Sequence, residues 1–258
     1  MNLLHSQGAF MAETRRLPGT VEFDGIADEP VQFACFQSLN DVACLWLAFQ
    51  NEAQTTVYHS HQWAKAWQST VGARLGAEPQ IIAGFGRQGR PLFILPLQSR
   101  RRSGLTVLEW HGSPDIPYGY GLFADAFLPQ ASSWFADNFE AVTAKAKSCD
   151  LIHLVNMPER MFGHPHPLVR SFNVTGANQS YLWRLDGCFN EVYSRKRNSE
   201  TRRANRRKDN RMAELGKLEF RQVTDRRELP AVINLMLKHK IARLAAEGVH
   251  GVFEQEEC

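Results

Sequence analysis

The stretch PQIIAGFGRQGRPLFILPLQSRRRSGLTVLEWHG, residues 79–112, contains three apolar runs separated by two short polar segments. The segments at residues 87–90 and 100–104 combine arginine with glycine, and such segments between apolar runs are typical of hairpin turns. Consecutive strands joined by short turns form an antiparallel meander. The pattern therefore predicts strands at residues 80–85, 91–99 and 105–111.

Strands and helices alternate around this meander. Apolar residues at helical spacing predict helices at residues 41–53, 60–71 and 132–147. Shorter apolar runs predict strands at residues 31–36, 150–156 and 180–185. The order β-α-α-β-β-β-α-β, followed by a loop and a strand, predicts an α/β (α+β) fold with a mixed sheet flanked by helices on both sides.

A second region begins near residue 188. A long polar helix is predicted at residues 191–215, with Gly216 as its C-cap. A strand at residues 218–223 and a helix at residues 227–247 follow, so the β-then-α pattern restarts. We therefore divide the chain into a flexible N-terminal arm, a first domain, and a basic helix with an incomplete second domain: residues 1–30, 31–187 and 188–258.

The composition is that of a folded protein without a membrane span. Hydrophobic residues make up 43% of the chain, which supports a buried core. There is no run of 18 apolar residues, and the N-terminus lacks the continuous apolar segment of a signal peptide, so we expect a cytoplasmic protein.

The cysteine and histidine patterns give no metal site. Five cysteines, an odd number without a CxxC pair, argue against a disulfide framework and a zinc site. We expect Cys35, Cys44 and Cys149 to be small core side chains. The alternating pair His59 and His61 has no cysteine or carboxylate at close ligand spacing, so no metal ligand is assigned.

Positive charge is concentrated in one segment. The chain has a net charge of +3, yet residues 195–211 contain nine Lys or Arg against two acids, so this segment carries +7 and the rest −4. Such a helix can contact phosphate groups on a small molecule, a lipid or a nucleic acid. The phosphate- or anion-binding candidates are Arg195, Lys196, Arg202, Arg203 and Arg206.

Two other interpretations of the basic helix stay open. It can be a solvated, charged helix that docks through apolar residues such as Val192, Tyr193 and Leu215. It can also bind nucleic acid, but residues 195–211 contain no aromatic side chain for base stacking and no helix-turn-helix rhythm, which argues against that partner.

Several short strings together resemble a known family. They are residues 58–63 followed by Trp67, Leu95-Pro96-Leu97, residues 108–112 leading to Asp115 and Tyr118, residues 150–154, and Ser194-Arg195-Lys196 followed by Gly216 and residues 218–220. In this order they resemble the two-domain, CoA-dependent acyltransferases of the GNAT superfamily that are grouped with bacterial cellulose-biosynthesis acetyltransferases.

The resemblance implies a function and a cofactor. It implies an N- or O-acyltransferase of polysaccharide or cell-envelope metabolism, with acetyl-CoA or another acyl-CoA as cofactor and a small molecule or saccharide as acceptor. In that family the first domain, here residues 31–187, is a degenerate GNAT-like repeat, and the second repeat carries the acyl-CoA site. Here only the first strand and helix of the second repeat are expected, so we expect the chain to be incomplete and inactive by itself.

The loop at residues 112–121 is the most site-like part of the first domain. It follows a core strand, where convergent polar groups often line a cleft. It lacks the Gln/Arg-x-x-Gly-x-Gly/Ala pattern that would hold a pyrophosphate, so we assign it to the acceptor. The acceptor-binding candidates are Trp110, His111, Asp115, Tyr118 and Tyr120. The alternative is structural, with Asp115 capping a turn, the tyrosines covering a sheet end and His111 at the surface.

The catalytic residues are not identified, and two further functions remain open. One is a non-catalytic binding or scaffold module that uses the basic helix to bind phosphate or another anion. The other is an aminoacyl transferase related to the peptidoglycan-bridge enzymes. An apolar seam around Ile233, Leu237 and Leu244 predicts self-association if no second domain covers it.

Overall fold

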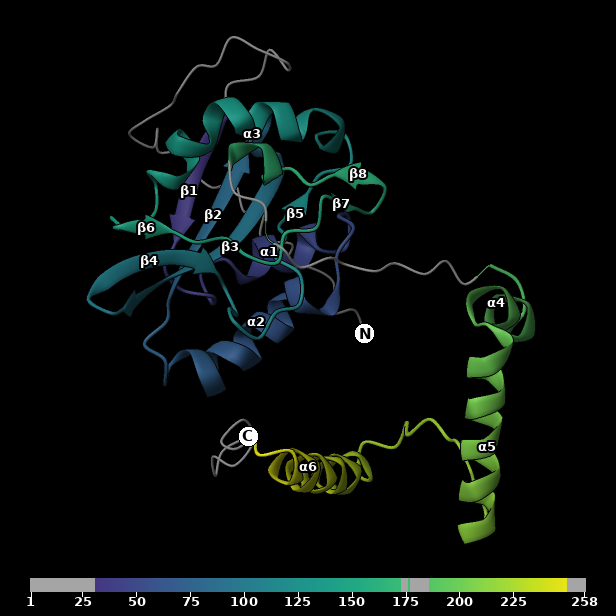
Figure 1. Cartoon of the computed structure of the whole chain (residues 1–258). Coiled ribbons are helices and arrows are strands. Elements are labelled where there is room, and N and C mark those ends of the chain that lie inside the picture. The colour runs from purple at the N-terminus through teal and green to yellow at the C-terminus, as the bar shows by residue number, and fades with distance from the viewer. Residues whose placement is uncertain (1–30, 173–175, 177–185, 250–258) are drawn as a thin grey trace, which may run out of the picture. The chain divides into compact units, whose positions relative to one another are not determined.

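The computed structural model describes residues 31–172, 176 and 186–249 (Figure 1). The chain divides into two compact units, Met1–Gln179 and Ser180–Cys258. The predicted N-terminal arm and the predicted strand at residues 180–185 lie outside the described residues. Each unit is taken by itself below.

Unit 1 is built on a mixed, six-stranded sheet. Its strands pair in the order β1-β2-β3-β4-β6, antiparallel from β1 to β4 and parallel between β4 and β6, while β5 pairs with β3. The strands are β1 (Gln32–Phe36), β2 (Glu78–Phe85), β3 (Pro91–Arg102), β4 (Leu105–Trp110), β5 (Leu122–Phe123) and β6 (Leu151–Ile152). The predicted meander is therefore present, as β2, β3 and β4.

The β3–β4 turn is tighter than predicted. Strand β3 continues through Arg102, and only Ser103 and Gly104 make the turn, both with positive φ, as two-residue hairpin turns require. The extension is stabilised by Glu109 on β4. Its carboxylate lies 3.0 Å from Arg100 Nε and 3.4 Å from Arg102 Nη1.

Helices cover both faces of the sheet (Figure 1). Helix α3 (Leu128–Thr143) lies on one face, and α1 (Ala43–Phe49) with α2 (His61–Trp67) lies on the other. Ser60 is the N-cap of α2, and its side chain accepts a hydrogen bond from Trp63 N. The remaining elements of unit 1 are η1 (Val57–His59), η2 (Gln68–Gly72), η3 (Arg87–Gly89), β7 (Arg160–Met161), β8 (His164–Pro165) and η4 (Val169–Ser171).

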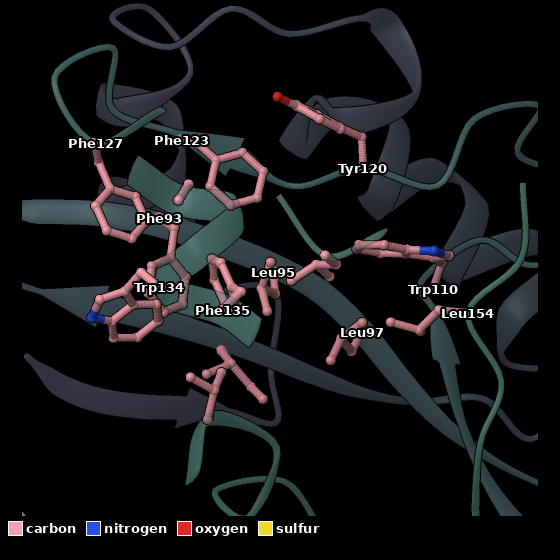
Figure 2. Packing of buried hydrophobic residues seen from close by; sticks show 14 of the residues in the cluster. Phe93, Leu95, Leu97, Trp110, Tyr120, Phe123, Phe127, Trp134, Phe135 and Leu154 are labelled. Carbon is pink, nitrogen blue, oxygen red and sulfur yellow. The ribbon is translucent and has the colours of Figure 1, made fainter. Parts of the chain in front are cut away.

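Alternation along the strands produces two cores. On the α3 face, Phe93 packs against Trp134 and Phe135, with ring centroids 5.8 and 4.9 Å apart (Figure 2). On the other face, Ile81 and Ile94 belong to a cluster with α1 and α2. Because successive side chains point to opposite faces, one run of apolar residues fills both cores.

Two predictions for unit 1 are wrong in detail. The strand predicted at residues 150–156 ends at Ile152, because the following chain bonds to the loop at residues 112–121 instead of to β4; Gly119 N donates to Asn156 O at 2.9 Å. Cys44 is exposed rather than a core side chain, whereas Cys35 and Cys149 are half-buried.

Unit 2 differs from its prediction at two points. The single helix predicted at residues 191–215 is two helices, α4 (Phe189–Lys196) and α5 (Ser199–Leu215), because Asn198 leaves the helical conformation and caps α5 by accepting from Thr201 N at 2.8 Å. Residues 218–223 are not a strand, since no described segment pairs with them. Helix α6 (Leu229–Ala246) follows, and no residue in it is buried.

Within the described part of the chain, none of the helices combines the length and the apolar character that crossing a bilayer requires. Ile233 is 45% exposed, and Leu237 and Leu244 are partly exposed, so the predicted self-association seam on α6 stays a prediction.

Candidate functional site

The loop at residues 112–121 is held in place by two buried histidines. His59 Nε2 lies 3.0 Å from Tyr118 O, and His166 Nε2 lies 2.9 Å from Gly119 O. A carbonyl oxygen can only accept, so both Nε2 atoms carry the proton and donate. His166 Nδ1 accepts from Leu168 N at 3.1 Å, which fixes the neutral tautomer.

Burial keeps these imidazoles neutral. It lowers the pKa of His166 to about 4, against a smaller opposing effect of the bond to Gly119 O, and it lowers the pKa of His59 in the same way. His111, which was expected at the surface in the structural interpretation, is 3% exposed. Its pKa is lowered to about 4 by burial, although the bond to Ala64 O opposes this.

Three of the five acceptor candidates are buried: His111, described above, and Trp110 and Tyr120, which lie deep in the core. Trp110 and Tyr120 are each 1% exposed, and Figure 2 shows both side chains within the packed apolar core. Burial raises the pKa of Tyr120. Neither Trp110 Nε1 nor the Tyr120 hydroxyl has a hydrogen-bond partner in the part of the chain that the structure describes. These two side chains pack on the core side of the loop and are not exposed to solvent.

Asp115 and Tyr118 are the candidates that solvent reaches. Asp115 is exposed, and its Oδ2 accepts from Trp67 Nε1 at 2.8 Å, while Tyr118 is 37% exposed. Asp115 N also donates to Gly112 O at 2.8 Å, so the expected turn is present too. The fixed carboxylate and the exposed phenol are the groups here that can bind a solute.

The same loop fills the space where β4 and β6 part. The two strands pair only at Val107 with Leu151 and Leu108 with Ile152, and His153 N makes the last bond, to Leu108 O. Beyond that point Asn156 bonds to the loop instead, donating from Nδ2 to Ile116 O at 3.0 Å. No ligand can lie between these strands unless the loop moves.

The start of α3 is equally closed to an anion. Phe127 N and Leu128 N both donate to Ala124 O, and Pro129 in the first turn has no N–H. Phe127 and Leu128 are each 3% exposed. The free amides that make a helix N-terminus an anion site are therefore used or covered here.

The basic candidates of unit 2 divide into two groups. Arg202 and Arg206 lie one turn apart on α5 and line a groove between α4 and α5, whereas Arg195, Lys196 and Arg203 do not line it. The groove is open to solvent, and its volume is about 540 Å³. Its lining residues are Phe189, Asn190, Glu191, Tyr193, Ser194, Arg202, Asn205, Arg206 and Asp209.

Aromatic side chains face these arginines across the groove. Phe189 and Tyr193, one turn apart on α4, stack with centroids 5.2 Å apart and planes at 14°. This pairing was not predicted, because both aromatic residues precede the basic segment at residues 195–211 in the sequence. The N-cap preference of Asn198 is the signal that could have predicted a helix break near Arg197 and Asn198. With that break, the two aromatic side chains are expected to fold back onto the basic helix.

Among the described residues, no three His, Cys, Asp or Glu side chains gather as a metal site would require. No protein-family model, curated protein or solved structure matches this chain.

Proposed function

We propose that this protein is an acyl-CoA-dependent acyltransferase of the two-domain GNAT type, in which unit 1 is a degenerate repeat that serves the acceptor and not the thioester. The support is the order of elements. A strand and two helices precede an antiparallel meander, and α3 then leads to β6, parallel to β4. The cytoplasmic location predicted from the sequence belongs to the same proposal.

The proposal that unit 1 serves the acceptor, and not the thioester, rests on the filled space between β4 and β6. Diverging parallel strands could receive an extended thioester arm, but here the loop at residues 112–121 is bonded to Asn156 through both Ile116 O and Gly119 N. Asp115 and Tyr118 remain exposed on the outer side of that loop. The unit can therefore bind an acceptor on its surface while excluding acyl-CoA from its sheet.

The reaction follows from the proposed class. An acceptor amine or hydroxyl attacks the thioester carbonyl, a C–N or C–O bond forms, the C–S bond breaks, and the proton of the acceptor is transferred to the departing thiolate. Holding both reactants in one geometry supplies much of the acceleration of such a transfer. On the acceptor side, the Asp115 carboxylate can accept a hydrogen bond from an amine or hydroxyl.

A second candidate function is a non-catalytic module that binds a phosphate-bearing ligand through unit 2. The groove with Arg202 and Arg206 favours it, because this site is complete within α4 and α5. This second function predicts that the protein binds acetyl-CoA no more tightly than it binds other phosphate-bearing anions.

Isothermal titration calorimetry of the full chain with acetyl-CoA tests the first proposal. The sequence predicts only the start of the second repeat in this chain, yet the groove between α4 and α5 is complete within unit 2, so we expect saturable binding of acetyl-CoA. This binding should be unchanged, within twofold, in Tyr118→Ala, because Tyr118 is assigned to the acceptor. Absence of acetyl-CoA binding contradicts the acyltransferase proposal. Loss of binding in Tyr118→Ala contradicts the assignment of unit 1 to the acceptor.

A further inference from the structure

We infer that the α4–α5 groove binds a ligand that combines a planar aromatic ring with a phosphate group, that is, the nucleotide portion of a small molecule. The inference rests on unit 2 alone. It holds whether the ligand is a free nucleoside diphosphate or the adenosine end of a coenzyme, since both present the same ring and phosphate.

The Phe189–Tyr193 stack is the platform for the ring. Phe189 is 75% exposed, so one face of its ring is open to a third ring. Aromatic side chains that face solvent stack bases independently of sequence. Tyr193 is held by Asn205, whose Nδ2 donates to the tyrosine hydroxyl at 2.8 Å, so the platform is fixed before a ligand arrives.

Arg202 and Arg206 supply the phosphate contact. They are spaced i, i+4 on α5 and line the same groove as the two aromatic rings. Neither guanidinium makes a salt bridge with any described residue. Unpaired guanidinium groups on one helix face bind phosphate oxygens through two parallel hydrogen bonds each.

The acidic residues of the groove limit where the anion can lie. Glu191 lies at the α4 start, where its Oε2 accepts from Cys188 N at 3.2 Å, and Asp209 lies three residues beyond Arg206 on α5. Both carboxylates repel an anion placed next to them and can accept hydrogen bonds from sugar hydroxyls. This favours a ligand with one charged end and a neutral, hydroxyl-bearing middle.

The size of the groove agrees with such a ligand. Its volume of about 540 Å³ lies in the range of small-molecule sites, roughly 300–1,000 Å³. A nucleic acid strand would need several stacking platforms along a basic track. The groove offers the single platform of Phe189 and Tyr193.

Titration of the full chain with ADP, adenosine and inorganic pyrophosphate tests the inference. We expect ADP to bind at least tenfold more tightly than adenosine or pyrophosphate, because each of those engages only half of the groove. Phe189→Ala and Arg202→Gln should each weaken ADP binding about fivefold or more. The matched control Arg203→Gln removes the same charge from the same helix outside the groove and should change binding less than twofold.

Circular dichroism at 222 nm shows whether each variant keeps its helices; if Phe189→Ala loses helix, Phe189→Leu replaces it as the test. Equal affinity for ADP and pyrophosphate, or equal losses in Arg202→Gln and Arg203→Gln, overturns the inference. Tighter binding of a single-stranded oligonucleotide than of ADP overturns it in favour of a nucleic acid surface. If the chain binds ADP but not acetyl-CoA, the inference about the groove stands and the acyltransferase proposal fails. If it binds acetyl-CoA and Phe189→Ala does not weaken that binding, the acyltransferase proposal stands and the inference about the groove fails.

Discussion

Asn205 on α5 donates from Nδ2 to the Tyr193 hydroxyl on α4 at 2.8 Å, which joins the two walls of the groove. Tyr193 in turn stacks on Phe189, so one side-chain bond on the basic helix sets the position of both rings. The bond connects the two helices across the break at residues 197–198. This break is not evident from the sequence, because basic residues lie on both sides of it.

Replacing Asn205 with leucine should weaken ADP binding about three- to tenfold, because the Tyr193 ring loses its anchor. The free energy of unfolding should fall by about 1 kcal/mol or less, the usual net value of one hydrogen bond. Calorimetry measures the first effect and urea unfolding the second. Asn210→Leu is the control, since Asn210 is exposed on the same helix and does not line the groove; an equal loss in both variants would contradict the role given to Asn205.

Unit 1 should lose stability as the pH falls below neutral. His111 and His166 have folded-state pKa values of about 4, below the unfolded value of 6.5, so the unfolded state binds more protons between these values. Stability is therefore fully present above pH 6.5 and is lost as the pH falls toward 4. Each histidine should cost about 2 kcal/mol between pH 7 and pH 5, measured as a shift of the urea midpoint followed by tryptophan fluorescence.

A variant separates this effect from general acid destabilisation. His166→Gln keeps an amide donor for Gly119 O but has no titration in this range, so the loss between pH 7 and pH 5 should shrink by about 2 kcal/mol. His153→Gln, at an exposed position, should leave the pH dependence as it is. If the free energy of unfolding depends on pH in the same way in wild type and His166→Gln, His166 is not held in its neutral form by burial.

Gly119→Ala should destabilise unit 1 by about 1–3 kcal/mol, as overpacking of a dense interior does. A Cβ at this position would overlap the Trp110 indole and lie 2.5 Å from Val155 O, and the backbone oxygen cannot turn away. Thermal unfolding measures the change. Gly176→Ala is the control, because no atom of a described residue lies within 4 Å of its Cβ position; equal melting temperatures for both variants would refute the close approach.

Glu109→Gln should lower the free energy of unfolding by about 2–3 kcal/mol, because it leaves Arg100, whose side chain is 12% exposed, without its counter-charge. Glu109 is fully buried, and its Oε1 also accepts from Gln98 Nε2 at 2.9 Å. Glu78→Gln is the comparison, since its pair with Lys147 at 2.7 Å is exposed and should contribute less than about 1 kcal/mol. Similar costs for the two substitutions, by urea unfolding, would mean that Glu109 is solvated.

The sheet of unit 1 could be predicted from the sequence wherever local signals sufficed. The meander follows from apolar runs and glycine turns, and the helix predicted to begin at residue 60 begins at His61 in the structure. The end of β6 could not be predicted, because Asn156 bonds to a loop that lies about 40 residues earlier in the chain. The strand at residues 218–223 was predicted from β-forming residues alone, and a strand exists only where a neighbour pairs with it.

The candidate sites show the same limit. The sequence marked Asp115 and Tyr118, which are exposed, together with Trp110 and Tyr120, which are core side chains, because position after a strand does not say which side chains face water. It marked Arg202 and Arg206 by charge, but not the aromatics opposite them. That relationship depends on where one helix ends and the next begins.

Hydrogen exchange of the full chain with and without saturating ADP tests the central proposal, that the groove between α4 and α5 in unit 2, and not the sheet of unit 1, binds the nucleotide. The account predicts slower exchange at residues 189–209 and no change at residues 107–110 and 151–156. Protection along β4 and β6 without any at residues 189–209 would contradict it.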